Sequence, residues 1–200
     1  MRFQYPLRLS FKLIAVAPQI YLRDATGNDL MYIHQKLFKL KESIGVYSNS
    51  SKSQELFKIG ADRIIDWSAR YNFTNSYDGR PWGSIKREGM KSLWRSSYLI
   101  FDPNGQQTHY LKEVDPWVKV ADGCLTSIPV LGMFSGYFFH PSYIIYQNGS
   151  NLPVMKLTKQ PAFWEGVFSL EPLVSSMPEE EEIRFVLSLI MMLLLERQRG

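Results

Sequence analysis

The stretch EEEEIRFVLSLIMMLLLERQRG, residues 179–200, decides the fold. Glutamates fill its first turn, and Arg197 and Arg199 stand near its end, so its charges suit the two poles of a helix dipole. In the run Ile183–Leu195 between them, Arg184 and Ser188 are the only polar residues. The remaining positions are apolar: Ile183, Phe185, Val186, Leu187, Leu189, Ile190, Met191, Met192, Leu193, Leu194 and Leu195. A helix that is apolar nearly all round must be enclosed by protein or by lipid.

The apolar run Ile183–Leu195 is shorter than the roughly 20 residues that a membrane span needs. Its flanks are charged on both sides. We therefore expect the central helix of a protein core and not a transmembrane protein. A tail anchor, an interfacial helix and a helix bound by a partner remain as alternatives.

Length and composition indicate one folded domain spanning residues 1–200. The net charge of +4 is too mild to indicate nucleic acid as a partner. Cys124 is the only cysteine, which excludes an internal disulfide and is compatible with a reducing compartment. The apolar run Leu13–Ala17 is too short for a signal peptide. We expect a cytoplasmic protein that is peripheral to a membrane if it binds lipid.

Short β-type runs that end in turns repeat along the chain. The clearest hairpin joins Tyr143–Gln147 to Leu152–Lys159 through Asn148 and Gly149. The other predicted strands are Gln19–Asp24, Leu30–His34, Leu37–Lys41, Ile44–Tyr47, Glu55–Ile59, Arg63–Trp67, Arg70–Thr74, Trp82–Arg87, Leu93–Phe101, Thr108–Glu113 and Phe163–Leu170. A short second helix is predicted over Trp117–Ser127.

These strands suffice to wrap the helix. A helix is about 10–12 Å across and a sheet packs about 10 Å from what it covers, so a surrounding sheet has a circumference of about 60 Å. Tilted strands each occupy about 6 Å of it, and roughly ten are required. We predict a mainly β fold: a closed antiparallel barrel of about twelve strands that encloses the C-terminal helix. A β-sandwich would leave one side of the helix in water and is less favoured.

Several segments together resemble one family. They are IYLRDATGNDLMYIHQKLFKLKE from Ile20, Gly83–Arg87, Ser92–Trp94, Tyr98–Asp102, Phe138–Tyr143 and Leu193–Arg197. In order and spacing the chain is similar to the LURP-one-related branch of the tubby C-terminal-like superfamily, which also includes the phospholipid scramblases. The resemblance implies a twelve-stranded barrel around a hydrophobic helix. It also raises the expectation of a basic surface for phosphoinositide head groups, as in tubby domains.

The chain departs from the scramblase pattern, since it has neither a cysteine-rich palmitoylation stretch nor a proline-rich N-terminal region. Lipid scrambling is therefore not expected. No residue motif transfers the tubby ligand contacts to this sequence.

The sequence contains few features that indicate an enzyme. His34, His109 and His140 lack metal-ligand spacing, and the neighbours of Cys124 include no base. Glycine loops that cradle phosphates and nucleophile-elbow motifs are absent from the sequence. We expect no catalytic residues, no metal and no cofactor.

One basic cluster is a candidate site for an anionic lipid or another phosphorylated ligand. It comprises Lys86, Arg87, Lys91 and Arg95, with Trp82 and Trp94 as flanking aromatic residues. Converging cations with tryptophans suit a phosphorylated head group. Strand alternation places Lys86 and Arg87 on opposite faces, so the four cations do not all converge. A solvated basic surface is the alternative interpretation.

Three hypotheses for function remain open. The first is a non-enzymatic module that binds an anionic membrane surface or phosphorylated ligand through the basic cluster. The second is a protein-interaction scaffold or assembly factor that uses exposed aromatic residues such as Trp82, Trp94 or Trp117. The third is an enzyme without a recognisable catalytic set.

Overall fold

The computed structural model describes residues 3–12, 19–34, 44–63, 69–88, 97–114, 142–161 and 165–197. The strands found there are β1 (Leu7–Lys12), β2 (Gln19–Arg23), β3 (Asp29–His34), β4 (Ile44–Tyr47), β5 (Glu55–Ala61), β6 (Arg70–Asn75), β7 (Pro81–Arg87), β8 (Ser97–Phe101), β9 (Gln107–Val114), β10 (Ser142–Gln147), β11 (Pro153–Gln160) and β12 (Glu165–Pro172). They are followed by one helix, α3 (Glu179–Arg197).

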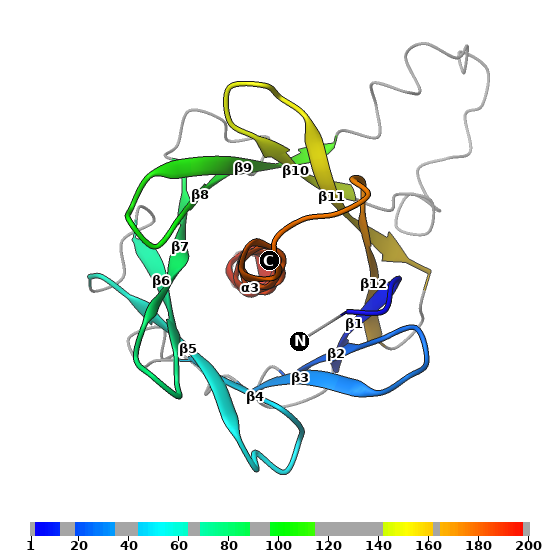
Figure 1. The fold of residues 1–200 in the computed structure, drawn as a ribbon. Coiled ribbons are helices and arrows are strands. Elements are labelled where there is room, and N and C mark those ends of the chain that lie inside the picture. The colour runs from blue at the N-terminus through cyan, green and yellow to red at the C-terminus, as the bar shows by residue number, and fades with distance from the viewer. Residues whose placement is uncertain are drawn as a thin grey trace, which may run out of the picture.

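The strands form a closed antiparallel barrel in which each strand pairs with its neighbours in sequence. The ring closes where β1 inserts between β12 and β2, with Leu9 opposite Phe168 on one side and Leu22 on the other. Figure 1 shows α3 running through the centre of this ring. The predicted barrel around a C-terminal helix is confirmed.

Alternation in each strand decides which side chains meet the helix. On β2, Ile20 and Leu22 point inward and are fully buried, while Tyr21 and Arg23 point outward. Inward apolar residues such as these surround α3, whose residues from Ile183 to Leu194 are all buried. The sequence pattern that predicted an enclosed helix therefore matches its packing.

The helix begins at Glu179, where the Pro178 carbonyl accepts hydrogen bonds from the amides of Glu181 and Glu182, both at 3.0 Å. Its described part ends at Arg197. Glutamates occupy the first turn and an arginine the last, as the dipole argument predicted.

Strand β1 was not predicted, because the N-terminal segment was assessed only as a possible signal peptide. Leu7, Leu9 and Phe11 nevertheless alternate with polar residues and lie in the core. The remaining predicted strands correspond to the observed ones within a few residues, except for Leu37–Lys41 and Arg63–Trp67. Those two predictions, and the predicted helix over Trp117–Ser127, lie outside the described residues or extend beyond them.

The barrel has two distinct ends. The described hairpin turns, residues 24–28, 48–54, 76–80, 102–106 and 148–152, lie at the end where α3 begins, which we call the entry end. The opposite end, where α3 finishes, we call the exit end. Contacts with the helix fix this assignment: Trp82 at the start of β7 contacts Glu180, and Arg87 at its end contacts Glu196.

Candidate functional site

Lys86 of the predicted basic cluster lies on the outer face of β7, because Ile85 beside it points into the core. Strand β7 pairs with β8, and the register sets Lys86 opposite Leu99. On its other side Lys86 lies opposite Arg70 of β6. The Arg70 guanidinium lies 3.9 Å from the centre of the Phe101 ring, a cation–π contact.

Arg87 takes the opposite direction, as alternation predicted, and faces the interior at the exit end. Its side chain is only 13% exposed, and its Nη2 lies 3.9 Å from Oε1 of Glu196 on α3. Tyr98 donates a hydrogen bond to the same carboxylate oxygen. Burial and the Glu196 carboxylate raise the pKa of Tyr98, so the phenol stays protonated as the donor. Arg87 and Lys86 thus serve different faces of the wall.

Trp82 lies at the entry end, far from Lys86 along β7. Its Nε1 donates to the Glu180 carbonyl at 3.2 Å, and its ring packs edge-on against Phe57 at 5.5 Å between centres. The structure therefore does not bring Trp82 together with Lys86 and Arg87. Lys91, Trp94 and Arg95 lie outside the described residues.

Two outward lysines that sequence reasoning did not assign to a site extend the basic face. Leu99 lies opposite Tyr110, and Lys112 stands two residues further along β9 with its Nζ 4.6 Å from the centre of the Tyr110 ring. Lys112 lies opposite Ile144, which in turn lies opposite Lys156. Strand alternation was the available signal for both lysines, since each follows an inward residue. We call Lys86, Lys112 and Lys156 the lysine face.

A buried polar cluster lies inside the entry end. Arg184 donates from Nε to the Trp82 carbonyl at 2.7 Å, and the Glu181 Oε1 lies 3.6 Å from Nδ1 of His109. The His109 ring packs edge-on against Phe185, with 4.6 Å between centres. Burial, followed by the charge of Arg184, lowers the pKa of His109 to about 4, and burial raises the pKa of Glu181. These buried contacts position the start of the helix, and His109 is not exposed to solvent.

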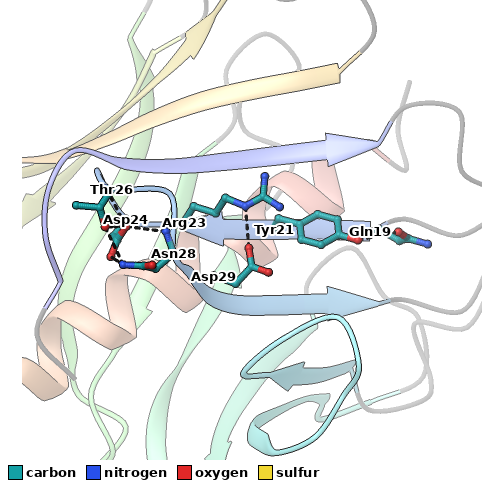
Figure 2. Close-up of polar contacts among 7 residues, drawn as sticks. All are labelled: Gln19, Tyr21, Arg23, Asp24, Thr26, Asn28 and Asp29. Carbon is teal, nitrogen blue, oxygen red and sulfur yellow. Dashed lines mark hydrogen bonds and ion pairs between the residues drawn. The ribbon is translucent and has the colours of Figure 1, made fainter.

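A polar hollow of about 840 Å³ opens at the entry end beside the turn between β2 and β3. Arg8, Pro6 and residues 23–29 line it. Figure 2 shows Asp24 turned into the loop, where it accepts hydrogen bonds from Thr26 and Asn28.

Those hydrogen bonds lower the pKa of Asp24 to about 2. Next to that turn, the Arg23 Nε donates to Oδ1 of Asp29 at 2.7 Å.

Metal ligands do not gather in the described part of the chain: no group of three or more His, Cys, Asp or Glu side chains could hold an ion there. Among the described helices, none is long and apolar enough to cross a membrane.

Comparisons with known proteins identify a similar fold. No family model and no curated protein matches the chain. The X-ray structure of the Arabidopsis thaliana protein AT5G01750 matches with a TM-score of 0.50 and 15% sequence identity, over 96% of this chain and 91% of that one. At this identity the likeness concerns the fold.

Proposed function

We propose that this chain is a non-enzymatic β-barrel module that binds an anionic lipid head group, or another phosphorylated ligand, on its basic outer surface near the exit end. The observation that carries the proposal is the lysine face. Lys86, Lys112 and Lys156 point outward from alternate strands β7, β9 and β11, with the partly exposed Leu99 and Ile144 between them. Lys91 and Arg95 follow Lys86 in sequence and are expected to add to this charge.

The spacing of the lysine face suits a charged surface better than a single small anion. Alternate strands lie about 10 Å apart, so Lys112 and Lys156 can each meet a different head group. Each lysine near an anionic membrane contributes roughly 1 kcal/mol. The resulting attraction weakens as salt screens it.

Family membership is part of the proposal. The likeness to the Arabidopsis fold and the segments from Ile20 onward both favour a LURP-one-related, tubby C-terminal-like domain that spans residues 1–200. Such a module would act in the cytoplasm and reach the membrane as a peripheral protein.

Liposome co-sedimentation tests the proposal. The purified chain is mixed with neutral phosphatidylcholine vesicles, or with vesicles that also carry phosphatidylserine or a phosphoinositide, at low and at physiological salt. The variant Lys86→Glu/Lys112→Glu reverses charge on the lysine face. The control is Lys58→Glu, an outward residue of β5 whose lysine is 53% exposed.

Arg87 is not a suitable surface variant. Replacing it with glutamate would set a second carboxylate beside that of Glu196 and destabilise the fold. A loss of binding in this variant would then reflect a loss of folding.

Binding to the anionic vesicles alone, weakened by salt, lost in Lys86→Glu/Lys112→Glu and kept in Lys58→Glu, supports the proposal. A loss in Lys58→Glu about half as large as in the double variant would show that only net charge matters, because the double variant changes the charge twice as much. Absence of binding to every vesicle would reject lipid as the ligand and leave the scaffold hypothesis.

The scaffold hypothesis has its own observation at the entry end. Tyr77 is 94% exposed at the turn between β6 and β7, and Leu152 and Leu173 are about half exposed. The amide of Leu173 donates to the Val154 carbonyl. Leu173, which follows β12, therefore lies near Leu152, which precedes β11. Affinity capture with the wild type and with Tyr77→Ser would test this surface, and an unchanged set of captured proteins would reject it.

A further inference from the structure

The hollow beside the β2–β3 turn contains a pair of like charges. Arg8 of β1 lies directly opposite Arg23 of β2 in the antiparallel ladder. Both point outward, because Leu7, Leu9 and Leu22 on either side of them fill the core. Side chains in such a pair leave the backbone about 5 Å apart, and like charges at this position destabilise a sheet. An anion bound between them would remove that penalty.

Only one of the two arginines is neutralised. Arg23 pairs with Asp29, which lies opposite it on β3, at 2.7 Å, and its guanidinium carbon lies 5.1 Å from the centre of the Tyr21 ring. Figure 2 shows this side chain extending along β2 from the turn toward Tyr21. Within the described part of the chain, Arg8 is exposed and has no acidic partner. Among the described residues, Arg8 is therefore the arginine of the hollow that has no carboxylate at ion-pair distance, although Asp24 and Asp29 both line the hollow.

The turn that borders the hollow is already ordered. Asp24 accepts hydrogen bonds from the amides of Thr26 and Asn28, both at 2.9 Å, and from both of their side chains. The amide of Ala25 donates to the Gln4 carbonyl at 3.1 Å, which ties the turn to the segment before β1. These hydrogen bonds turn the Asp24 carboxylate into the loop, and its negative charge stays at the border of the hollow. A ligand would enter a preformed wall at little ordering cost.

We propose that this hollow is a phosphate-binding site, in which the guanidinium groups of Arg8 and Arg23 hold the phosphate of a phosphomonoester. A guanidinium presents paired donors that match phosphate oxygens, and two of them from opposed positions can share one tetrahedral anion. The volume of about 840 Å³ lies in the range of small-molecule sites, so it admits the rest of a phosphorylated molecule. The phosphate belongs either to a free metabolite or to a lipid head group.

This site is separate from the lysine face. It lies at the entry end, on β1 and β2, while Lys86 stands near the exit end of β7. Its test therefore gives a result independent of vesicle binding through Lys86 and Lys112.

A matched control exists in the same molecule. Arg80 pairs with Asp78 at 2.6 Å and lies 5.7 Å from the centre of the Trp82 ring, so it repeats the surroundings of Arg23. It differs in lying in the turn before β7, so that it has no described arginine opposite it in a strand pair. Arg80→Gln thus removes the same charge without removing an arginine pair.

The experiment is a titration of the full chain, labelled with nitrogen-15, with glycerol 3-phosphate, followed by amide chemical shifts at constant ionic strength. We expect saturable shifts for residues 23–29. Arg8→Gln should weaken the affinity by at least about tenfold, the value for one charge-assisted contact. Arg80→Gln and Lys86→Glu/Lys112→Glu should retain it. Because Arg8→Gln also relieves repulsion, its melting temperature should equal or exceed that of the wild type, which separates lost binding from lost folding.

A second arm uses vesicles that carry phosphatidic acid. If these vesicles broaden the amide signals of residues 23–29 and glycerol 3-phosphate reverses the broadening, the bound phosphate is that of a lipid head group. Soluble binding without any vesicle effect identifies a free phosphorylated molecule. The proposal is overturned if sodium chloride reproduces the shifts, if residues 23–29 do not respond, or if Arg80→Gln weakens binding as much as Arg8→Gln does.

Discussion

The two ends of α3 are held by different sets of polar contacts. At the entry end the helix supplies both charges, since Arg184 donates to the Trp82 carbonyl and Glu182 accepts from Tyr5. At the exit end the helix supplies the anion, since Glu196 receives Tyr98 and faces Arg87 from the wall. Between these ends, residues 185–194 of the helix are all buried, and Ser188 is the polar one among them.

The difference teaches how a nearly featureless helix acquires a fixed position. The middle buries apolar surface in every direction, so it stabilises the barrel without favouring one axial or rotational setting. Directional contacts at both ends can supply that preference. We therefore expect changes in the middle to remove stability altogether, and changes at the ends to have smaller effects that differ between the ends.

The largest effect is expected from Leu189→Asp. Leu189 is fully buried in the middle of α3, and the change would place an unpaired carboxylate there. The cost should be at least about 5 kcal/mol, comparable with the total stability of many domains. Circular dichroism should show loss of the folded signal at room temperature. Leu173→Asp is the control, because Leu173 is 45% exposed and its change should be nearly neutral. An unchanged melting temperature in Leu189→Asp would mean that the helix is not enclosed in solution.

The next effect is expected from Gly83→Ala at the entry end. Gly83 has a φ of +123°, and an added Cβ would lie 2.5 Å from the Phe101 carbonyl oxygen and 2.7 Å from Cδ of Arg184. Backbone strain and this overlap should cost about 3 kcal/mol in denaturant unfolding. Gly149→Ala is the control, since Gly149 has a φ of +86° but no atom within 4 Å of the added carbon. It should cost about 1–2 kcal/mol. Equal losses would show that the Phe101 carbonyl and the Arg184 side chain both shift at little cost.

Much of this fold follows from local sequence signals. The barrel was predicted because an all-round apolar helix must be enclosed and the strand-like runs were numerous enough to enclose it. Strand β1 was missed although Leu7, Leu9 and Phe11 alternate as a half-buried strand should, because this segment was assessed only for export and not for strand alternation. The alternation was the better guide, since it reports directly on which side chains face a core.

The candidate sites were less predictable, because they depend on pairs that are distant in sequence. Alternation separated Lys86 from Arg87, but the position of Glu196 beside Arg87 depends on how far α3 penetrates the barrel. Likewise, Arg8 and Arg23 become a pair only through the register of β1 with β2. Trp82 and Lys86 are close in sequence, yet the length of β7 separates them.

The free energy of unfolding is expected to depend on pH through His109 at the entry end. Its folded pKa of about 4 lies below the usual value near 6.5, because burial and Arg184 disfavour the charged ring. The unfolded chain therefore binds more protons between these values, and stability contributed by neutral His109 is lost as the pH falls from about 6.5 to 4. The loss should reach roughly 3 kcal/mol at most.

Denaturant unfolding of wild type and His109→Gln at pH 7 and pH 4.5 measures this loss. Glu181 and Arg184, which face the ring, are present in both proteins, so the difference between them isolates His109. The variant should lose less stability on acidification. Identical losses would mean that the ring already pairs with Glu181 as a cation.

The smallest effect compares one phenol at each end. Tyr98 is fully buried and donates to Glu196 at the exit end, while the half-buried Tyr5 donates to Glu182 at 2.7 Å at the entry end. Tyr98→Phe should cost about 1.5–2 kcal/mol, because the fully buried phenol makes a charge-assisted hydrogen bond that the variant loses. Tyr5→Phe should cost about half as much, since the Tyr5 side chain is only half-buried. Thermal unfolding resolves the difference, at about 2–4 °C for each kcal/mol in a chain of this size.

The variant Glu196→Gln tests whether the negative charge of Glu196 contributes to stability at the exit end. The amide oxygen can still accept from Tyr98, but it no longer attracts Arg87. If directional contacts at this end fix the helix, Tyr98→Phe should cost less in the Glu196→Gln background than in the wild type, because a neutral acceptor makes the weaker hydrogen bond. Additive losses from the two changes would mean that the carboxylate and the phenol act independently, and that apolar packing alone positions the end of α3.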